Sequence, residues 1–263
     1  MEITGYIASI FIGISLGLIG SGGSILTVPV LVYLFGIGVE MSTAYSLFIV
    51  GSTALVGGVR NAFLGNVNYK TAVVFTIPAF IAVYTTRAYL VPAIPSVIIT
   101  LGTYVLTKDI AIMVFFALVM LAASVNMIRN KRKKEEENAV PQLNLPVIII
   151  EGAVVGVLTG IVGAGGGFLI IPALVLFAKL PMKKAVGTSL LIIAAKSLIG
   201  FIGDVQRYGD QLDWTRLLTV TAIAVFGIFI GIYLNTFIDG KKLKKGFGWF
   251  VLLMAVYIIG KQL

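Results

Sequence analysis

The residue in this chain with the clearest chemical potential is Lys196, which stands in the middle of the apolar run 186–203. About 12 Å of helix separates it from Asp204, farther than a lysine side chain comfortably reaches. An ammonium group near the centre of a bilayer usually faces the protein interior and marks a substrate pathway or an ion pair. We interpret Lys196 as a residue that binds substrate or couples its movement. The alternative is a structural pair with Asp204 or with a helix end.

Two glycine-rich breaks interrupt long apolar runs and are the second feature with chemical potential. Glycine accepts the positive φ that a sharp reversal requires, and a neighbouring serine can cap the helix that follows. The free N–H groups and the positive dipole end of such a helix favour an anion. A nucleotide-binding loop does not fit, because neither a βαβ unit nor a Gly-Lys-Ser/Thr ending is present. The predicted anion-binding residues in these breaks are Gly20, Ser21, Gly22, Gly23 and Ser24, and Gly163, Ala164, Gly165, Gly166 and Gly167.

An internal repeat contains both breaks. Segment 13–57 reappears at 156–200, with every position shifted by 143 residues and no gap. Two glycine-broken apolar segments in one membrane chain are typical of a transporter whose substrate site lies where the copies meet. The shift pairs Thr53 with Lys196. It also yields four further polar candidates for substrate binding, which are Tyr45, Ser46, Thr188 and Ser189.

Several other residues have simpler interpretations. Glycines at four-residue spacing are predicted to be packing faces for neighbouring helices, because small residues let two backbones approach closely; these are Gly13, Gly17, Gly156 and Gly160. For Tyr45 and Thr188, a hydrogen bond to their own helix backbone is the alternative to a substrate contact. Anchoring at the membrane interface is the simpler interpretation of four residues near predicted helix ends, Arg60, Asn61, Arg87 and Arg207.

Composition indicates an integral membrane protein. Hydrophobic residues make up 59% of the chain and charged residues only 12%, whereas about a quarter of a soluble domain is charged. The chain has neither Cys nor His, which removes thiol chemistry and the commonest metal ligand, so we expect no cofactor and no metal. The net charge of +9 does not indicate nucleic acid, because 9 of the 20 basic residues fall in two short loops, 129–134 and 241–245.

Run lengths predict an all-α polytopic membrane protein. The opening runs 3–37 and 147–178 would each be roughly 50 Å long as single helices, too long for one crossing, so each is predicted to form a helical hairpin. The predicted fold has two inverted repeats, each opening with a glycine-broken helical hairpin followed by three transmembrane helices. The spans are expected at about 43–60, 71–91, 109–128, 186–203, 215–238 and 246–262. The repeats cover residues 1–128 and 146–263, joined by a basic cytoplasmic linker, 129–145.

Charge predicts the orientation of the spans. If each hairpin returns to the side it entered from, the basic residues at 129–134, 179–184 and 241–245 share one face, which should be cytoplasmic. The N-terminus and the C-terminus then both lie outside, and the two hairpin tips are expected to meet near the midplane. The apolar centre of segment 92–108 is too short to span, so we assign this segment to an outer interfacial or re-entrant position.

The doubled glycine pattern resembles the sulfite exporter TauE/SafE family of prokaryotic membrane transporters. The opening pattern of that family, Gly-x-Gly-Gly-Gly with a downstream proline, is present at 163–167 with Pro172, and in the first half at 20–24 with Pro29. Its second element is similar to 185–190 followed by Asp213-Trp214. Many members carry a histidine shortly before that element, whereas this chain has Asn61 and Asp204 nearby, so the resemblance does not extend to histidine-based proton coupling.

This resemblance implies sulfite, sulfonates such as sulfoacetate, or related sulfur oxyanions as substrates, carried across the inner membrane of a prokaryotic cell. We expect an exporter that binds its anion at the midplane between the hairpin tips; the alternative is an importer of thiosulfate or a small carboxylate, with or without proton coupling. An intramembrane enzyme lacks support, because the spans contain no His, Cys or clustered carboxylate pair. The expected partners are the small anion and the lipid bilayer, and not nucleic acid. The sequence is compatible with an oligomer.

Overall fold

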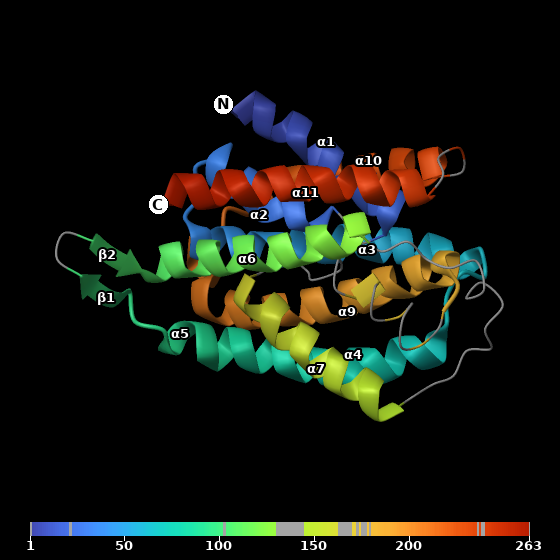
Figure 1. Cartoon of the computed structure of the whole chain (residues 1–263), viewed down its shortest axis with the longest axis horizontal. Helices are drawn as coiled ribbons and strands as arrows, with labels where there is room; N and C mark the ends of the chain where they lie inside the picture. The colour runs from blue at the N-terminus through green and yellow to red at the C-terminus, as the bar shows by residue number, and fades with distance from the viewer. Residues whose placement is uncertain are drawn as a thin grey trace.

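The computed structural model describes residues 2–20, 23–101, 104–129, 145–162, 170, 171, 174, 178, 180–235, 237 and 240–262. They form an elongated helical bundle with both chain termini at the same end (Figure 1). Within these residues, four helices are long and apolar enough to cross a membrane: Val39–Phe63, Tyr69–Ala93, Lys183–Gln211 and Trp214–Asn235. The prediction of a helical, multi-pass membrane protein is confirmed at this level.

The first half of the chain begins with two helices separated by a sharp turn. Its breakpoint is Gly20, whose φ of 80° lies in the left-handed region that glycine tolerates. The predicted interruption of the first long run is therefore present. The elements of this half are α1 (Glu2–Ile19), α2 (Ser24–Tyr33), α3 (Val39–Phe63), α4 (Tyr69–Thr85), the π-helix η1 (Thr86–Leu90), α5 (Val91–Ala93), β1 (Val97–Leu101), β2 (Tyr104–Thr107) and α6 (Lys108–Arg129).

The start of α2 differs from the prediction in two details. The N-cap residue is Gly23, without a side-chain cap, so Ser24 is the first helical residue and not the cap. Pro29 consequently lies in the second turn of α2, where its missing N–H deprives the carbonyl group of Ile25 of its helical donor. Its place a few residues after the glycine break predicts a proline in the first turn, where a missing N–H costs least because first-turn donors have no intrahelical partner; in the structure it is a local weakness of the helix.

Segment 92–108 contains a β-hairpin. Strands β1 and β2 pair in antiparallel fashion, with Leu101 opposite Tyr104 and an irregularity between Val97 and Ile99. The hairpin projects beyond the helices at the end of the bundle that holds the termini (Figure 1). The outer interfacial or re-entrant position expected for this segment stays a prediction; the structure adds that its backbone donors and acceptors pair between two strands.

The second half of the chain repeats the order of long helices. Its elements are α7 (Leu145–Val162), α9 (Met182–Tyr208), the short 3₁₀ helix η3 (Gly209–Gln211), α10 (Trp214–Asn235) and α11 (Gly240–Gln262). Helix α7 ends immediately before the second glycine break. That break, Gly163, Ala164, Gly165, Gly166 and Gly167, lies outside the described residues, as do Ser21 and Gly22 of the first break.

The helices of the two halves pair with each other in a reciprocal pattern. Helix α1 packs along α10 and α7 packs along α4, while α3 contacts α9 and α6 contacts α11. Exchanging each helix with its counterpart in chain order leaves this pattern unchanged. Counterparts also run in opposite directions along the bundle: α6 leaves the end that holds the termini, whereas α11 returns to it (Figure 1).

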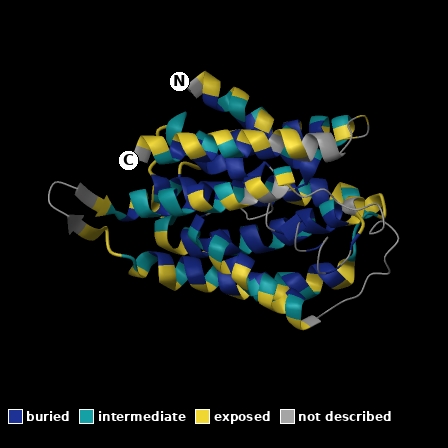
Figure 2. Cartoon of the chain, in the orientation of Figure 1, coloured by how far each residue is buried: buried dark blue, intermediate teal, exposed yellow. Residues whose placement is uncertain are grey.

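Close packing at these contacts requires the glycines at four-residue spacing. A Cβ atom added at Gly13 or Gly17 would overlap the backbone of α10, and one added at Gly156 or Gly160 would overlap α4 or η1. The prediction that these glycines form helix-packing faces is confirmed. Buried residues accordingly line the facing sides of the helices, and exposed residues cover the outside (Figure 2).

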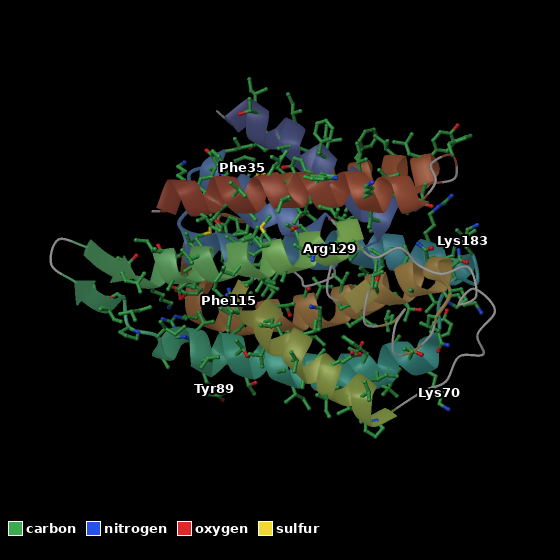
Figure 3. All side chains as sticks on the ribbon, in the orientation of Figure 1. Phe35, Lys70, Tyr89, Phe115, Arg129 and Lys183 are labelled. Carbon is green, nitrogen blue, oxygen red and sulfur yellow. The ribbon has the colours of Figure 1, made fainter. Side chains whose placement is uncertain are left out.

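Charged side chains are distributed unequally between the two ends of the bundle. Lys70 and Lys183 project from the end opposite the chain termini (Figure 3). The other end contains the first turn of α3, with Glu40, and the last turns of α9, with Asp204. One end of the molecule is therefore basic, and the other contains several acidic groups.

Candidate functional site

Lys196 is a buried lysine midway along α9, in the interior of the molecule. Its side chain is 1% exposed, and its Nζ atom donates a hydrogen bond to Thr159 Oγ1 on α7 at 3.0 Å. No carboxylate in the described part of the chain forms an ion pair with it. Around this level α9 crosses α3, with Leu198 packed on Gly51. The predicted burial of Lys196 is confirmed, but its alternative pairing with Asp204 is wrong.

Asp204 instead pairs with Arg87, which the sequence led us to expect at the membrane interface. Arg87 Nε lies 2.9 and 3.0 Å from the two carboxylate oxygens, and Nη2 lies 2.7 and 2.8 Å from them. The two residues are 2% and 3% exposed, so the interface interpretation of Arg87 is wrong. The available signal was Asp204 itself, since a carboxylate within a span needs a cation from another helix.

The remaining Arg87 donors join two more helices to this ion pair. Nη1 donates to Thr43 Oγ1 on α3 at 2.8 Å and to the carbonyl oxygen of Gly160 on α7 at 3.4 Å. Thr43 in turn donates to the carbonyl oxygen of Glu40 at 2.7 Å. Arg87 and Lys196 therefore contact consecutive residues, Gly160 and Thr159, in the last turns of α7 before the second glycine break.

A second polar cluster covers the outer edge of this ion pair. Glu40 Oε1 accepts hydrogen bonds from Lys108 Nζ at 3.1 Å and from the hydroxyl group of Tyr208. These contacts join the beginnings of α3 and α6 to the end of α9. Tyr208 lies one helical turn after Asp204, so the two clusters form successive layers at the same end of the bundle.

Buried hydroxyl groups lie along one face of α3. Thr43, Ser46 and Thr53 are separated by three and seven residues, which places them on the same side of a helix. Ser46 Oγ and Thr53 Oγ1 are fully buried and have no hydrogen-bond partner within the described structure. Because a buried hydroxyl group without a partner is costly, these two groups are available for a ligand. Ser189 differs, since its hydroxyl group donates to the carbonyl oxygen of Val186.

Tyr45 and Thr188, the other predicted hydroxyl pair, contact loops of the opposite half. The Tyr45 hydroxyl accepts the backbone N–H of Asp213 at 2.6 Å, and Thr188 Oγ1 accepts that of Asn68 at 2.9 Å. The side chains of Asn68 and Asp213 accept from the first-turn N–H groups of α4 and α10. The hydroxyl oxygens of Tyr45 and Thr188 therefore do not bond to the backbone of their own helices. Each accepts a hydrogen bond at the start of a helix in the other half of the chain.

The first glycine break and the end of α7 lie at different depths of the bundle. Gly20, in the first break, packs against Val186, whereas the last turn of α7 lies beside Arg87 and its partner Asp204. Val186 and Asp204 are separated by about 27 Å along α9 at 1.5 Å per residue. Gly20 and the end of α7 therefore lie toward opposite ends of the molecule; the second tip, 163–167, lies outside the described residues, so the expectation that both tips meet at the midplane stays a prediction.

A bundle of membrane-spanning helices with charged and hydroxyl side chains buried at its centre has the architecture of a membrane transporter. The chain belongs to the sulfite exporter TauE/SafE family, whose sequence profile matches residues 6–258. This finding confirms the resemblance seen in the glycine pattern.

Similar proteins from other organisms are described as probable membrane transporters. A probable membrane transporter protein of Xylella fastidiosa is 28% identical, over 95% of this chain and 92% of its own. One of Bacillus subtilis is 26% identical over 94% and 91%, and one of Methanocaldococcus jannaschii is 37% identical over 44% and 45%. No solved structure gives a significant match.

Proposed function

We propose that this transporter exports a small sulfur-containing anion, such as sulfite or an organosulfonate, and that Lys196 binds the anion. The single observation that supports this function most is the buried side chain of Lys196, whose Nζ atom has Thr159 as its only hydrogen-bond partner among the described residues. A buried charge without a counterion is strongly unfavourable, so an anion at this point would complete the site. The description of the family as sulfite exporters supports a sulfur oxyanion.

Several buried hydroxyl groups of the bundle suit the oxygen atoms of such an anion. Thr159 lies next to the ammonium group, and Ser46 and Thr53 have buried hydroxyl groups without partners in the part of the chain that the structure describes. The O–H groups of Ser46 and Thr53 can donate to the negatively charged oxygens, which makes strong hydrogen bonds, whereas that of Thr159 donates to the carbonyl oxygen of Gly156. The backbone N–H groups of the second glycine break, which follows α7 directly in sequence, complete the proposed site.

The proposed transport mechanism uses two inverted repeats. Support comes from the opposite directions of corresponding helices and from the reciprocal pairing of α1 with α10 and of α7 with α4. In such transporters one repeat moves against the other around a central site. Lys196 occupies that centre, and its counterpart in the first repeat is Thr53, so the site itself is asymmetric.

The proposed orientation places the basic end of the bundle in the cytoplasm and both termini outside. Lys70 and Lys183 at one end support it, because basic residues concentrate on the cytoplasmic side of membrane proteins. An inside-negative membrane potential then favours exit of an anion by about 2.3 kcal/mol per charge per 100 mV. Export in this direction needs no coupled ion.

Flux and binding measurements with Lys196 variants test this function. Purified protein in proteoliposomes should carry radiolabelled sulfite or sulfoacetate more rapidly than thiosulfate or acetate, and an imposed potential should set the direction. Lys196→Met should weaken binding of the anion by about tenfold to a hundredfold, since a hydrogen bond to a charged group contributes about 1.5–3 kcal/mol. Lys196→Arg keeps the charge with a different shape and should retain partial binding.

Thr53→Val is the matched control at the equivalent position of the first repeat. It removes one neutral hydroxyl group, so its effect on affinity should be smaller, about 1 kcal/mol. Each variant is checked for a monodisperse state in detergent. Unchanged affinity in well-folded Lys196→Met would assign the lysine to structure, and faster flux of acetate than of sulfite would reject the proposed substrate class.

A further inference from the structure

Arg87 lies where four elements of the bundle meet. Its side chain starts from η1, and its guanidinium group donates to Asp204 on α9, Thr43 on α3 and the carbonyl oxygen of Gly160 on α7. Gly160 is in the last turn of α7, next to Thr159, which accepts the hydrogen bond of Lys196. A basic side chain that donates to one of the last carbonyl groups of a helix stabilises that helix end.

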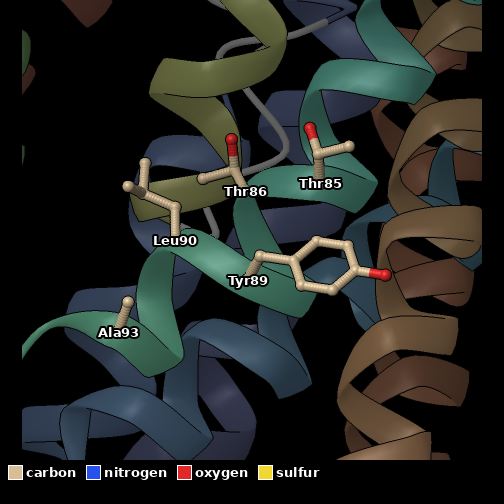
Figure 4. A pocket seen from close by; sticks show the side chains of 5 residues that line it. All are labelled: Thr85, Thr86, Tyr89, Leu90 and Ala93. Carbon is tan, nitrogen blue, oxygen red and sulfur yellow. The ribbon is translucent and has the colours of Figure 1, made fainter.

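The local backbone brings η1 into tight contact with the end of α7. Residues 86–90 form a π-helix, a rare widening of the helical turn that is frequent at functional sites. A Cβ atom added at Gly160 would lie only 2.7 Å from Thr86 Cβ. The outer side of this turn is a shallow surface pocket (Figure 4), lined by Thr85, Thr86, Tyr89, Leu90 and Ala93.

The charge of Arg87 is already compensated. Both carboxylate oxygens of Asp204 lie within 3.0 Å of its Nε atom, and both residues are almost completely buried. An anion that bound Arg87 would displace Asp204 and leave a carboxylate unpaired in the protein interior, which is costly. Lys196 has no such competitor within the described structure, so an anion is attracted to Lys196 and not to Arg87.

We infer that Arg87 is a positioning residue of the anion site. It holds the last turn of α7, and with it Thr159, against the first half of the chain, while Asp204 and Thr43 fix the plane of the guanidinium group. This inference rests on the proposed function, because the site that Arg87 positions is the one defined by Lys196.

Arg87→Lys in the full-length protein tests this role. A lysine keeps the positive charge beside Asp204, but its single ammonium group cannot also reach Thr43 and Gly160 as the planar guanidinium group does. We expect a folded protein whose affinity for sulfite falls about tenfold, the loss expected for one hydrogen bond to a charged group. Backbone amides at 156–162 should exchange with deuterium faster, even without sulfite, while those of α11 should not change.

The inference requires both changes. A lower affinity with unchanged exchange at 156–162 would make Arg87 a direct ligand of the anion, and unchanged affinity would remove it from the site altogether. Thr43→Val, which keeps the ion pair and the side-chain shape, provides the same two readouts if Arg87→Lys does not fold. Lys196→Met is measured in parallel. Unchanged affinity in that variant refutes the proposed site, whereas a loss there with no effect of Arg87→Lys refutes only the positioning role.

Discussion

Hydroxyl groups at equivalent positions of the two halves have equivalent structural roles. Tyr45 and Thr188 each accept the backbone N–H of a residue that begins a helix in the opposite half, Asp213 and Asn68. A phenol and a threonine hydroxyl can replace each other here, because only an acceptor oxygen in the right place is required. The hydroxyl oxygens of Tyr45 and Thr188 thus have a structural role, and their part in substrate binding stays a prediction.

Tyr45→Phe should therefore lower stability without changing anion binding. The substitution leaves the partly buried N–H group of Asp213 without an acceptor, which should cost about 1–3 kcal/mol. Thermal unfolding in detergent measures the loss of stability, and Tyr89→Phe on the exposed surface is the control that should change nothing. A well-folded Tyr45→Phe protein with weakened sulfite affinity would instead show that the hydroxyl group binds substrate.

Single charged residues were predictable from the sequence to different degrees. Lys196 stands in the middle of an apolar run, so its burial follows from position alone. Arg87 lies near the end of its run, where interface anchoring is the ordinary outcome, and its partner Asp204 is 117 residues away. The π-helix that turns Arg87 inward is equally difficult to predict from the sequence, because a local change of helical register depends on tertiary packing and not on composition.

At the scale of elements, the glycine faces determine how closely helices approach. Gly13→Ala should destabilise the protein by about 1–3 kcal/mol, because the added methyl group overlaps the backbone of α10 and the helices must separate. Gly246→Ala is the matched control. A Cβ atom at that position of α11 meets nothing within 4 Å, so alanine should stabilise the helix by about 0.5–1 kcal/mol. Equal unfolding temperatures of the two variants in detergent would contradict this explanation.

Run length predicted the long helices and the first break, but not the hairpin at 97–107. An apolar run of about 20 residues in lipid forms a helix, because a helix satisfies all of its backbone hydrogen bonds internally. Segment 92–108 is too short for that constraint, so local propensity decides. Its β-branched residues Val97, Ile98, Ile99 and Thr100 favour a strand, a signal that the apolar character of the segment obscured.

At the scale of the whole molecule, the unequal ends of the bundle predict its orientation in the membrane. The chain contains no cysteine, so single cysteines report accessibility without background. Cysteines at Lys70 and Lys183 should resist a membrane-impermeant thiol reagent applied to intact cells, whereas those at Ser96 and Gln211 should react. All four positions are exposed, so burial does not explain a difference. Labelling of Lys183 from outside would reverse the proposed orientation.

The pairing of α1 with α10 has a consequence for biosynthesis. Helix α1 is synthesised about 200 residues before the helix that its glycine face contacts, which is made only when residues 214–235 emerge. At about 5–20 residues per second, this face waits roughly 10–40 seconds for its partner. The first half cannot complete its packing while it is being translated. The contact between α1 and α10 therefore forms late, and a product truncated before α10 would lack the surface on which α1 packs.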